Sequence, residues 1–403
     1  MKKICLFLAG FYISALGLFA QKPDTVQYKP RKLSLTEINF VSSYYHQEGN
    51  NSAITGGTGT EKLSDYSNSF EVKLLKYNKR DRKVELDANL GIDYYTSASS
   101  DKIDPYTISS ASARDLRVYP SLKRTVTNEK GNTVSGIVSY SHESDYRSYG
   151  LGAGITRLSK DKNREFSAKA QLYADWLKLI LPVEMRTAST GGLYGEPNYH
   201  DYPWRSRTTF NLGLSVTQVV NQRLQWMLLF DPTIQKGYLG LPFHRIYFKN
   251  FTMSNERLPS SRFKIPIGLR ANYFAGDKLV VKSFYRFYTD DWKLTAHTAE
   301  AELAYKASPK LTLSPFYRFY TQQGTRYFAG YRQHNAGEEF YSSNFDLSTF
   351  KSHFIGLGAK VGLPSGVFGM NKIKMIELRY GYYKRTNGLQ SHIVSIRLQY
   401  KRK

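Results

Sequence analysis

The stretch VELDANLGIDY, residues 84–94, alternates apolar and polar residues with a period of two. Side chains of a β-strand point alternately to the two faces of its sheet, so this stretch would form one apolar face and one polar face. The same alternation recurs from Phe166 to Trp176, from Arg207 to Thr217 and from Val394 to Tyr400. The chain is therefore predicted to consist of long, two-faced strands.

The composition favours a membrane barrel over a soluble β-sandwich. The chain has 403 residues with 32 Tyr and 23 Phe, yet its mean hydropathy is −0.47 and 22% of its residues are charged. After the N-terminal segment, no apolar stretch is long enough for a transmembrane helix. A transmembrane barrel combines these properties, because lipid-facing apolar residues alternate with polar lumen-facing ones and aromatic residues collect at the two interfaces.

Short and long connections alternate along the chain. Tight turns such as Tyr77–Arg82, Asn128–Asn132 and Ser159–Arg164 are separated by long polar stretches such as His46–Tyr66 and Thr96–Arg114. Short periplasmic turns and long extracellular loops are typical of bacterial outer-membrane barrels. We therefore expect an all-β fold, an antiparallel transmembrane β-barrel of about 16 strands (roughly 14 to 18), in the cell outer membrane. The expected strands begin near Leu35, Ser67, Lys83, Asp115, Val134, Ser148, Glu165, Ser206, Leu224, Arg262, Lys278, Thr295, Lys310, Thr349, Ile373 and Leu389.

Three connections depart from this regular pattern. Thr289–Lys293 and Glu143–Arg147 are short for external loops, and Leu363–Lys372 is long for a periplasmic turn. These departures leave the strand count open by about two. An even count predicts that both ends of the barrel lie on the periplasmic side.

The N-terminus has the layout of a secretory signal peptide. Lys2 and Lys3 precede the apolar run Ile4–Leu18, and Ala20 offers a small residue at the cleavage point. This arrangement of a basic start, a short apolar run and a small residue is typical of a segment that is removed after export. The apolar run is also too short for a comfortable transmembrane helix.

The expected domain organisation follows from this segment. Residues 1–20 would be the cleaved signal peptide, residues 21–34 a short basic periplasmic segment and residues 35–403 the barrel. The short segment ahead of the barrel predicts no plug domain. The one cysteine, Cys5, lies in the cleaved segment, so no disulfide and no cysteine metal site are expected in the mature chain.

Basic residues dominate the predicted periplasmic end. The chain has a formal net charge of +24, and the predicted turns contribute strongly to it, for example through Lys79, Arg80 and Arg82. This excess favours contact with anionic phospholipid or with an acidic periplasmic or envelope protein partner. Simple solvation of the turns explains it equally well. Nucleic acid is not an expected partner of an exported barrel.

The predicted lumen face carries charges of both signs. An open pore lined in this way would weakly prefer anions and could pass a small anionic solute. Alternatively, opposite charges on neighbouring strands pair and fill the interior. No cofactor is expected in either case. The expected pore-lining or ligand-binding residues are Arg286, Arg318, Lys282, Arg270, Arg207, Glu300, Glu302, Tyr288 and Tyr320.

One hexapeptide repeats within the chain. FYRFYT occurs at residues 284–289 and again at residues 316–321, and YGYYKR at residues 380–385 is similar to both. All three copies are expected on strands that run outward, so their aromatic residues would form an interfacial girdle at the external rim. A sharper hypothesis is a ligand platform in the lumen. Its expected members are Phe284, Arg286, Tyr288, Phe316, Arg318 and Tyr320.

The first copy of this repeat also carries a resemblance. YRFYTDDW at residues 285–292, with AHT at residues 296–298 and ISSAS at residues 108–112, resembles the signature of an uncharacterised Gram-negative outer-membrane β-barrel family, a domain of unknown function. The resemblance extends from about the third strand to the end of the chain. It implies a barrel and an outer-membrane location and brings no established activity. Ala113 and the basic tail after Tyr400 depart from the family pattern, which weakens any transfer of a loop function.

Motifs for catalysis or metal binding are sparse. The eight histidines include no HxxxH or HExxH spacing, so no metal site is expected. Asp290, Asp291 and His297 lie close together along one predicted hairpin and are the candidates for a hydrolase site at the external rim. Carboxylates beside a short turn more often stabilise that turn.

Three functions therefore remain in view. The first is a channel or transport pore with weak anion preference, in which a long loop such as Leu179–Arg205 folds inward as a constriction. The second is a filled barrel that acts as a scaffold or docking unit of an envelope complex. The third is the rim hydrolase.

Overall fold

The structure is a computed structural model that describes residues 29–96, 114–185, 202–363, 365–367 and 370–401. The predicted signal peptide and the Ser-rich motif at residues 108–112 lie outside the described residues. None of the helices in the described part of the chain is long and apolar enough to span a membrane.

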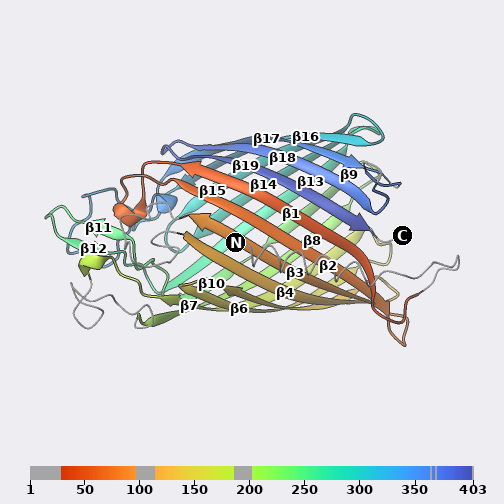
Figure 1. The fold of residues 1–403 in the computed structure, drawn as a ribbon, viewed down its shortest axis with the longest axis horizontal. Helices are drawn as coiled ribbons and strands as arrows, with labels where there is room; N and C mark the ends of the chain where they lie inside the picture. The colour runs from red at the N-terminus through yellow and green to blue at the C-terminus, as the bar shows by residue number, and fades with distance from the viewer. Residues whose placement is uncertain (1–28, 97–113, 186–201, 364, 368–369, 402–403) are drawn as a thin grey trace.

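The described chain forms one closed antiparallel barrel (Figure 1). The sheet contains 17 hydrogen-bonded segments, and β1 pairs with β19 to close it. Two of these segments, β9 and β10, are halves of one strand, because their registers against β8 and β13 continue without a shift across Asp231 and Pro232. The barrel therefore has 16 strands, as predicted.

The strands have the following bounds: β1 (Ser34–Glu48), β2 (Leu63–Tyr77), β3 (Lys83–Thr96), β4 (Arg114–Thr127), β5 (Thr133–His142), β6 (Tyr146–Leu158), β7 (Arg164–Lys178), β8 (Trp204–Val219), β9 (Leu224–Phe230), β10 (Thr233–Gly237), β13 (Ser261–Phe274), β14 (Leu279–Asp290), β15 (Thr295–Lys306), β16 (Leu311–Gln323), β17 (Phe350–Gly362), β18 (Ile373–Arg385) and β19 (Gln390–Lys401). Each predicted strand start lies within a few residues of an observed one. The period-two alternation predicts these starts well because each strand must present one face to lipid and the other to the lumen.

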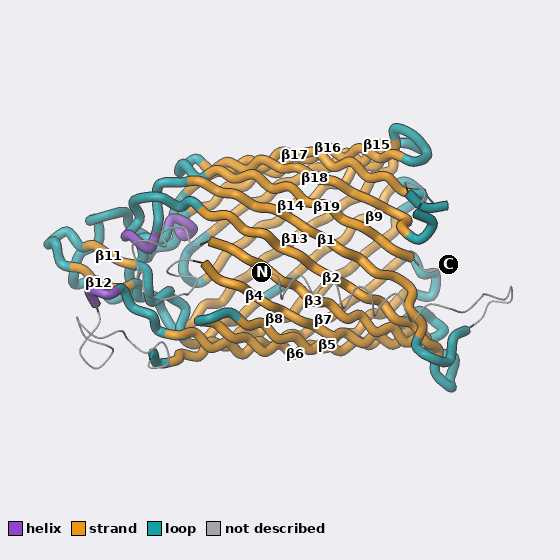
Figure 2. The backbone as a smooth tube through the Cα atoms, in the orientation of Figure 1, coloured by secondary structure: helices purple, strands orange, loops and turns teal. Residues whose placement is uncertain are grey.

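The two ends of the barrel differ in the length of their connections (Figure 2). Short turns join β2 to β3, β4 to β5 and β6 to β7 at one end, which we call the turn end. Long connections, such as residues 238–260 and 324–349, lie at the other, the loop end. Glu37 near the start of β1 pairs with Lys401 at the end of β19, so both ends of the barrel meet at the turn end. This arrangement assigns the turn end to the periplasm and the loop end to the exterior.

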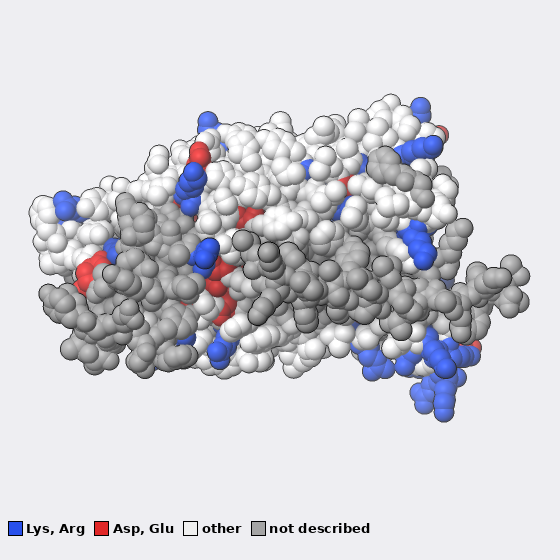
Figure 3. All heavy atoms as spheres, in the orientation of Figure 1, with Lys and Arg blue, Asp and Glu red and all other residues white. Residues whose placement is uncertain are grey.

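The outer surface of the barrel is an apolar belt. Large apolar side chains face outward and stay exposed along its strands, including Val138 at 52%, Leu151 at 62% and Ile355 at 56%. Such a belt on a soluble protein would be an unusually large exposed apolar surface, whereas lipid covers it in a membrane. In the face shown in Figure 3, Lys and Arg gather most densely at the turn end, over the turn between β2 and β3. The chain is thus an outer-membrane β-barrel.

Several external loops form a packed cap at the loop end (Figure 1). The cap contains the hairpin β11 (Arg245–Tyr247) and β12 (Met253–Asn255), with the short helices η1 (Ala53–Thr55), η2 (Val183–Met185) and η4 (Phe345–Leu347). Arg245 ties three loops together, since its guanidinium donates to the carbonyl of Ile54 at 2.8 Å and to the carboxylate of Glu184 at 2.5 Å. Ile246 and Phe248 form a small apolar core with Tyr341.

A second buried contact holds the cap loops together. Glu256 is 4% exposed and accepts hydrogen bonds from the hydroxyl of Ser342 at 2.5 Å and from the amide of Leu241 at 2.8 Å. His244 Nδ1 lies 3.4 Å from its carboxylate. Burial alone would raise the pKa of Glu256, but the neighbouring His244 and these hydrogen bonds outweigh it and lower the pKa below its ordinary value. The carboxylate therefore stays charged and paired inside the cap.

Candidate functional site

A cavity of about 470 Å³ lies on the lumen wall near the loop end. It is lined by side chains from β14, β15, β16, β17 and β18 and by Asp346 of the loop between β16 and β17. Four aromatic residues and three arginines are among its lining residues. The lining residues are Phe284, Arg286, Thr298, Glu300, Arg318, Tyr320, Gln322, Asp346, Phe350, Ser352, Tyr383 and Arg385.

The repeated hexapeptide builds this wall. Within FYRFYT the first, third and fifth residues face the lumen, so the two copies direct Arg286 and Arg318 inward. Glu300 on β15 lies between them and pairs in register with Arg318. Four of the six residues of the expected platform line the cavity: Phe284, Arg286, Arg318 and Tyr320.

The arginines of the cavity differ in their partners. Arg318 donates to the carboxylate of Glu300 at 2.6 Å, and Arg385 donates to the carboxylate of Asp346 at 2.6 Å. Arg286 has no ion pair among the residues that the structure describes. An unpaired guanidinium beside aromatic rings is a site that an anionic group can bind with two parallel hydrogen bonds. Arg286 is therefore the arginine of this cavity that stands out as a candidate for binding an anionic group.

The loop between β16 and β17 covers one side of the cavity. Gln322 donates to the carbonyls of Asp346 and Ser348, at 2.9 and 2.5 Å, which holds η4 close to the lumen wall. The guanidinium of Arg385 stacks on Phe350, with its central carbon 4.6 Å from the ring centroid. We expected the inward loop to be Leu179–Arg205; most of that loop lies outside the described residues, and the loop seen to fold inward is residues 324–349.

A second cavity, of about 290 Å³, lies on the adjacent wall and is mainly acidic. It is lined by Tyr45, Leu63, Asp65, Asp93, Tyr95, Arg117 and Glu143. Ile393 on β19 pairs with both Tyr45 on β1 and Gly381 on β18, so only β19 separates the walls of the two cavities. The lumen therefore has a basic wall and an acidic wall side by side at the loop end.

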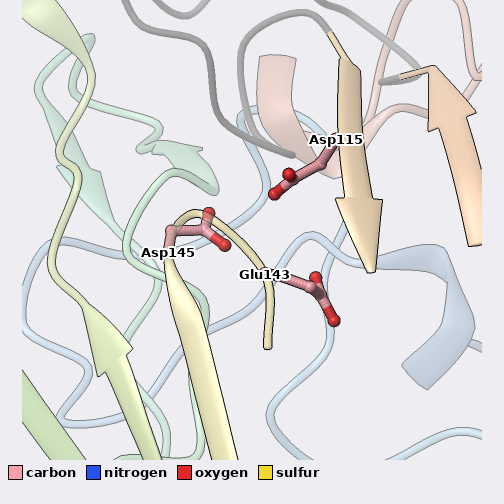
Figure 4. Close-up of side chains that lie close together, drawn as sticks. All are labelled: Asp115, Glu143 and Asp145. Atoms are coloured by element: carbon pink, nitrogen blue, oxygen red, sulfur yellow. The ribbon is translucent and has the colours of Figure 1, made fainter. Parts of the chain in front are cut away.

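Three carboxylates gather next to the acidic wall (Figure 4). Asp115, Glu143 and Asp145 each offer an oxygen, and these oxygens lie within 4.8 Å of one another, a spacing that a divalent cation could bridge. Protein groups already contact two of them: Ser144 donates to Asp115, and Tyr95 donates to Glu143 at 2.6 Å. Burial raises the pKa of Glu143 above its ordinary value. The sequence did not predict this cluster, because Asp115 lies at the start of β4 while Glu143 and Asp145 lie in the turn between β5 and β6, and the three have no metal-binding spacing.

Other predicted lumen residues pair with one another, as the filled-interior alternative expects. Glu302 accepts from Lys282 at 2.8 Å and from Arg379 at 2.7 Å. Arg207 pairs with Asp175 at 2.8 Å. Two further residues have other contacts: Arg270 stacks on Phe284 with 5.5 Å between its central carbon and the ring centroid, and the hydroxyl of Tyr288 donates to Asp290 at 2.9 Å. Lys282 and Arg318 nevertheless keep 49% and 46% of their side-chain surface exposed, so the described lumen wall is solvated.

The structure does not bring together the three residues expected at a rim hydrolase. Asp290 faces inward and its carboxylate accepts from Arg262 at 2.5 Å and from the amide of Leu294 at 3.0 Å. His297 faces outward, because it pairs in register with Phe287, one residue from Arg286, whose side chain lines the lumen cavity. Asp291 is exposed in the tight turn between β14 and β15. Asp290 is a turn-stabilising group, and the barrel wall separates it from His297.

Comparison with known protein families identifies the family of this chain. Residues 13–395 match the family described as "Protein of unknown function (DUF3570)". The chain belongs to this family. The match covers nearly the whole chain and confirms the resemblance carried by the YRFYTDDW segment. No curated protein matches this family member.

Outer-membrane proteins are among the solved structures to which the chain is similar at low identity. A BenF-like porin from Pseudomonas fluorescens Pf-5 is 10% identical with a TM-score of 0.43, and the match covers 93% of this chain and 100% of the porin. The outer membrane protein OprD from Pseudomonas aeruginosa is 9% identical with a TM-score of 0.43, over 95% and 97% of the two chains. The siderophore receptor PirA from Acinetobacter baumannii is 11% identical with a TM-score of 0.47, over 87% of this chain and 53% of the receptor.

Sequence reasoning missed seven residues of the main cavity: Thr298, Gln322, Asp346, Phe350, Ser352, Tyr383 and Arg385. Arg385 was seen only as part of the third, weaker copy of the repeat, and Asp346 and Phe350 belong to an irregular loop and its exit. The alternation of β18 was a usable signal for Arg385, since it lies six residues from Arg379 and so on the same face, and Arg379 faces the lumen and donates to Glu302. No sequence signal identified Asp346, because a long loop has no period that fixes its direction.

Proposed function

We propose that this barrel is a channel for small solutes that carry an anionic group, and that the cavity around Arg286 is its selectivity site. The observation that carries the proposal is that Arg286, in a cavity of about 470 Å³ on the lumen wall, has no ion pair within the described part of the chain. A carboxylate or phosphate would bind this guanidinium, while Phe284 and Tyr320 contact the apolar part of the solute.

The charge arrangement supports a weak preference for anions. Three arginines line the cavity, and two of them are offset by Glu300 and Asp346. The net positive charge is then small, so a solute would be held loosely enough to leave again. The partly exposed side chains of Arg318 and Lys282 are consistent with a hydrated path along this wall.

The experiment is anion block of single-channel current in a planar bilayer, with citrate as the probe. Arg286→Gln removes the unpaired charge, and we expect about tenfold weaker block, the loss of one charge-assisted hydrogen-bonding group. Lys282→Gln is the matched control, because it removes a cation from the same face of β14 that is already paired with Glu302. Equal block by both variants and the unmodified protein would reject the cavity as the selectivity site.

A docking unit of an envelope complex is the second candidate. The basic turn end and the packed cap favour it, since a barrel that only docks a partner has no need of an open mouth. The two candidates predict different outcomes in the bilayer: a docking unit gives no current steps and co-purifies with an acidic periplasmic partner.

A further inference from the structure

The lipid-facing residues of the repeated hexapeptide make a recurring contact with histidine that plays no part in the proposed channel. Tyr285 and Phe287 face lipid and hold His297 of the next strand between them. The hydroxyl of Tyr285 lies 2.7 Å from His297 Nδ1, and the ring centroids of Phe287 and His297 are 5.2 Å apart. One ring therefore fixes the imidazole by a hydrogen bond and the other by ring contact.

The same arrangement occurs twice more around the barrel. Tyr317 lies 2.7 Å from Nδ1 of His353, which also contacts Phe319 at 5.4 Å between centroids. Tyr380 lies 2.8 Å from Nδ1 of His392, which contacts Tyr382 at 5.0 Å between centroids. The three copies stand on consecutive hairpins, β14–β15, β16–β17 and β18–β19. We call each copy a Tyr–His clamp.

Each clamp engages one ring nitrogen of its histidine, Nδ1, with the tyrosine hydroxyl. With the tyrosine hydroxyl donating to Nδ1, the proton of a neutral imidazole lies on Nε2. His297, His353 and His392 are all exposed on the outer surface and lie within three residues of the loop end of their strands. Since apolar residues such as Ile355 and Val394 begin just below them, the clamps lie where the apolar belt meets the headgroup layer.

Lys384 lies between the clamps of His353 and His392. Lys384 on β18 pairs in register with His353 on β17 and with Gln390 on β19, two residues from His392. Lys384 has no ion pair among the described residues. Lys351 lies on the same outward face of β17, two residues from His353. We define Lys351, His353, Lys384 and His392 as the outer patch.

The outer patch has the charge of an anion-binding surface. Strands β16 to β19 carry no carboxylate on this face within their described residues, because their one acidic residue, Glu377, faces the lumen. The nearest one along the sheet is Glu48 of β1, opposite Gln390, and it lies 3.5 Å from His46. Neighbouring strands are about 4.8 Å apart, so Lys384 and His353 can contact one phosphate group together.

We propose that the outer patch binds the phosphate groups of a phosphorylated glycolipid in the outer leaflet. The occupant follows from the position of the patch: it lies at headgroup depth, faces lipid and offers two lysines and two imidazole N–H donors without a carboxylate among them. Lipid-specific recognition of this kind combines surface lysines with fixed donors. This binding is independent of solute transport through the lumen.

The experiment is native mass spectrometry of the whole barrel in detergent, titrated with diphosphorylated lipid A. We expect Lys384→Gln to weaken binding about fivefold, the effect of one lysine near a charged lipid surface, and Lys384→Gln with His353→Ala to weaken it further. Lys236→Gln is the matched control, since Lys236 is an exposed lysine at the loop end whose register partners are Thr208 and Ser261.

Several outcomes would overturn the proposal. If phosphate-free lipid A binds as tightly as the diphosphorylated form, the outer patch is an ordinary aromatic girdle that does not recognise phosphate. If Lys236→Gln weakens lipid A binding as much as Lys384→Gln does, the effect is one of general charge. If inorganic phosphate binds as tightly as lipid A, no lipid is required. Added salt tests the unmodified protein without any folding risk: the proposal expects weaker binding as salt rises, because exposed charges are screened.

Discussion

The guanidinium of Arg385, on β18, donates to the carboxylate of Asp346, in the loop between β16 and β17, at 2.6 Å. This ion pair links the lumen wall to the loop that covers the main cavity. Arg385 is largely buried, whereas Asp346 keeps 64% of its side-chain surface exposed. Such a half-exposed pair contributes little free energy, about 1 kcal/mol or less, so little free energy is needed to release this loop from Arg385.

Breaking this pair should favour the open state of the proposed channel. In Asp346→Asn, Arg385 loses its charged partner, and we expect the ratio of open to closed dwell times to rise about two- to fivefold. Single-channel recording measures the ratio directly. Glu339→Gln is the control, because Glu339 is exposed in the same loop and carries the same charge. A similar change in both variants would mean that loop charge, and not the ion pair, controls opening.

Removing the carboxylate of Asp290 should destabilise the barrel rather than abolish a reaction. Its carboxylate is fully buried and holds Arg262, whose guanidinium lies 4.2 Å over the ring of Trp292. Asp290→Ala leaves Arg262 without its partner, and we expect the free energy of unfolding in urea to fall by about 3 kcal/mol. The neighbouring exposed Asp291→Ala should change it by less than about 0.5 kcal/mol. Equal effects would contradict the structural role of Asp290.

The cap should loosen in acid. The pKa of Glu256 is lowered in the folded cap, so its pairing stabilises the cap above the ordinary pKa of 4.5 and this stability is lost as the pH falls toward the folded value. We expect amide protection at Leu241 and Ser342 to decrease below about pH 4.5, measured by hydrogen exchange corrected for intrinsic rates. Glu256→Gln should remove this pH dependence. Retention of it would assign the effect to other groups.

The barrel could be predicted from the sequence and the cap could not. Residues 84–94 alternate visibly because one face must meet lipid, and the same rule fixes which face Arg286 and Arg318 occupy. Arg245 follows no such rule. It is held by Ile54 and Glu184, which are 191 and 61 residues away in the chain.

The lumen site was therefore predictable on its strands and unpredictable where a loop enters it. Arg286 and Arg318 stand in a repeat with a fixed phase, whereas Asp346 reaches the cavity through an irregular loop. The sequence also does not show which of the two arginines has a carboxylate partner. Nothing in the sequence distinguishes Arg318, which pairs with Glu300, from Arg286, which has no ion pair in the described part of the chain.

The most direct test of the central claim is the conductance of the purified barrel in a planar bilayer, with the reversal potential measured under a salt gradient. We predict discrete current steps and a reversal potential that shows weak anion preference, reduced in Arg286→Gln. A correctly folded, heat-modifiable barrel that gives no steps, or steps with cation preference, would contradict the claim.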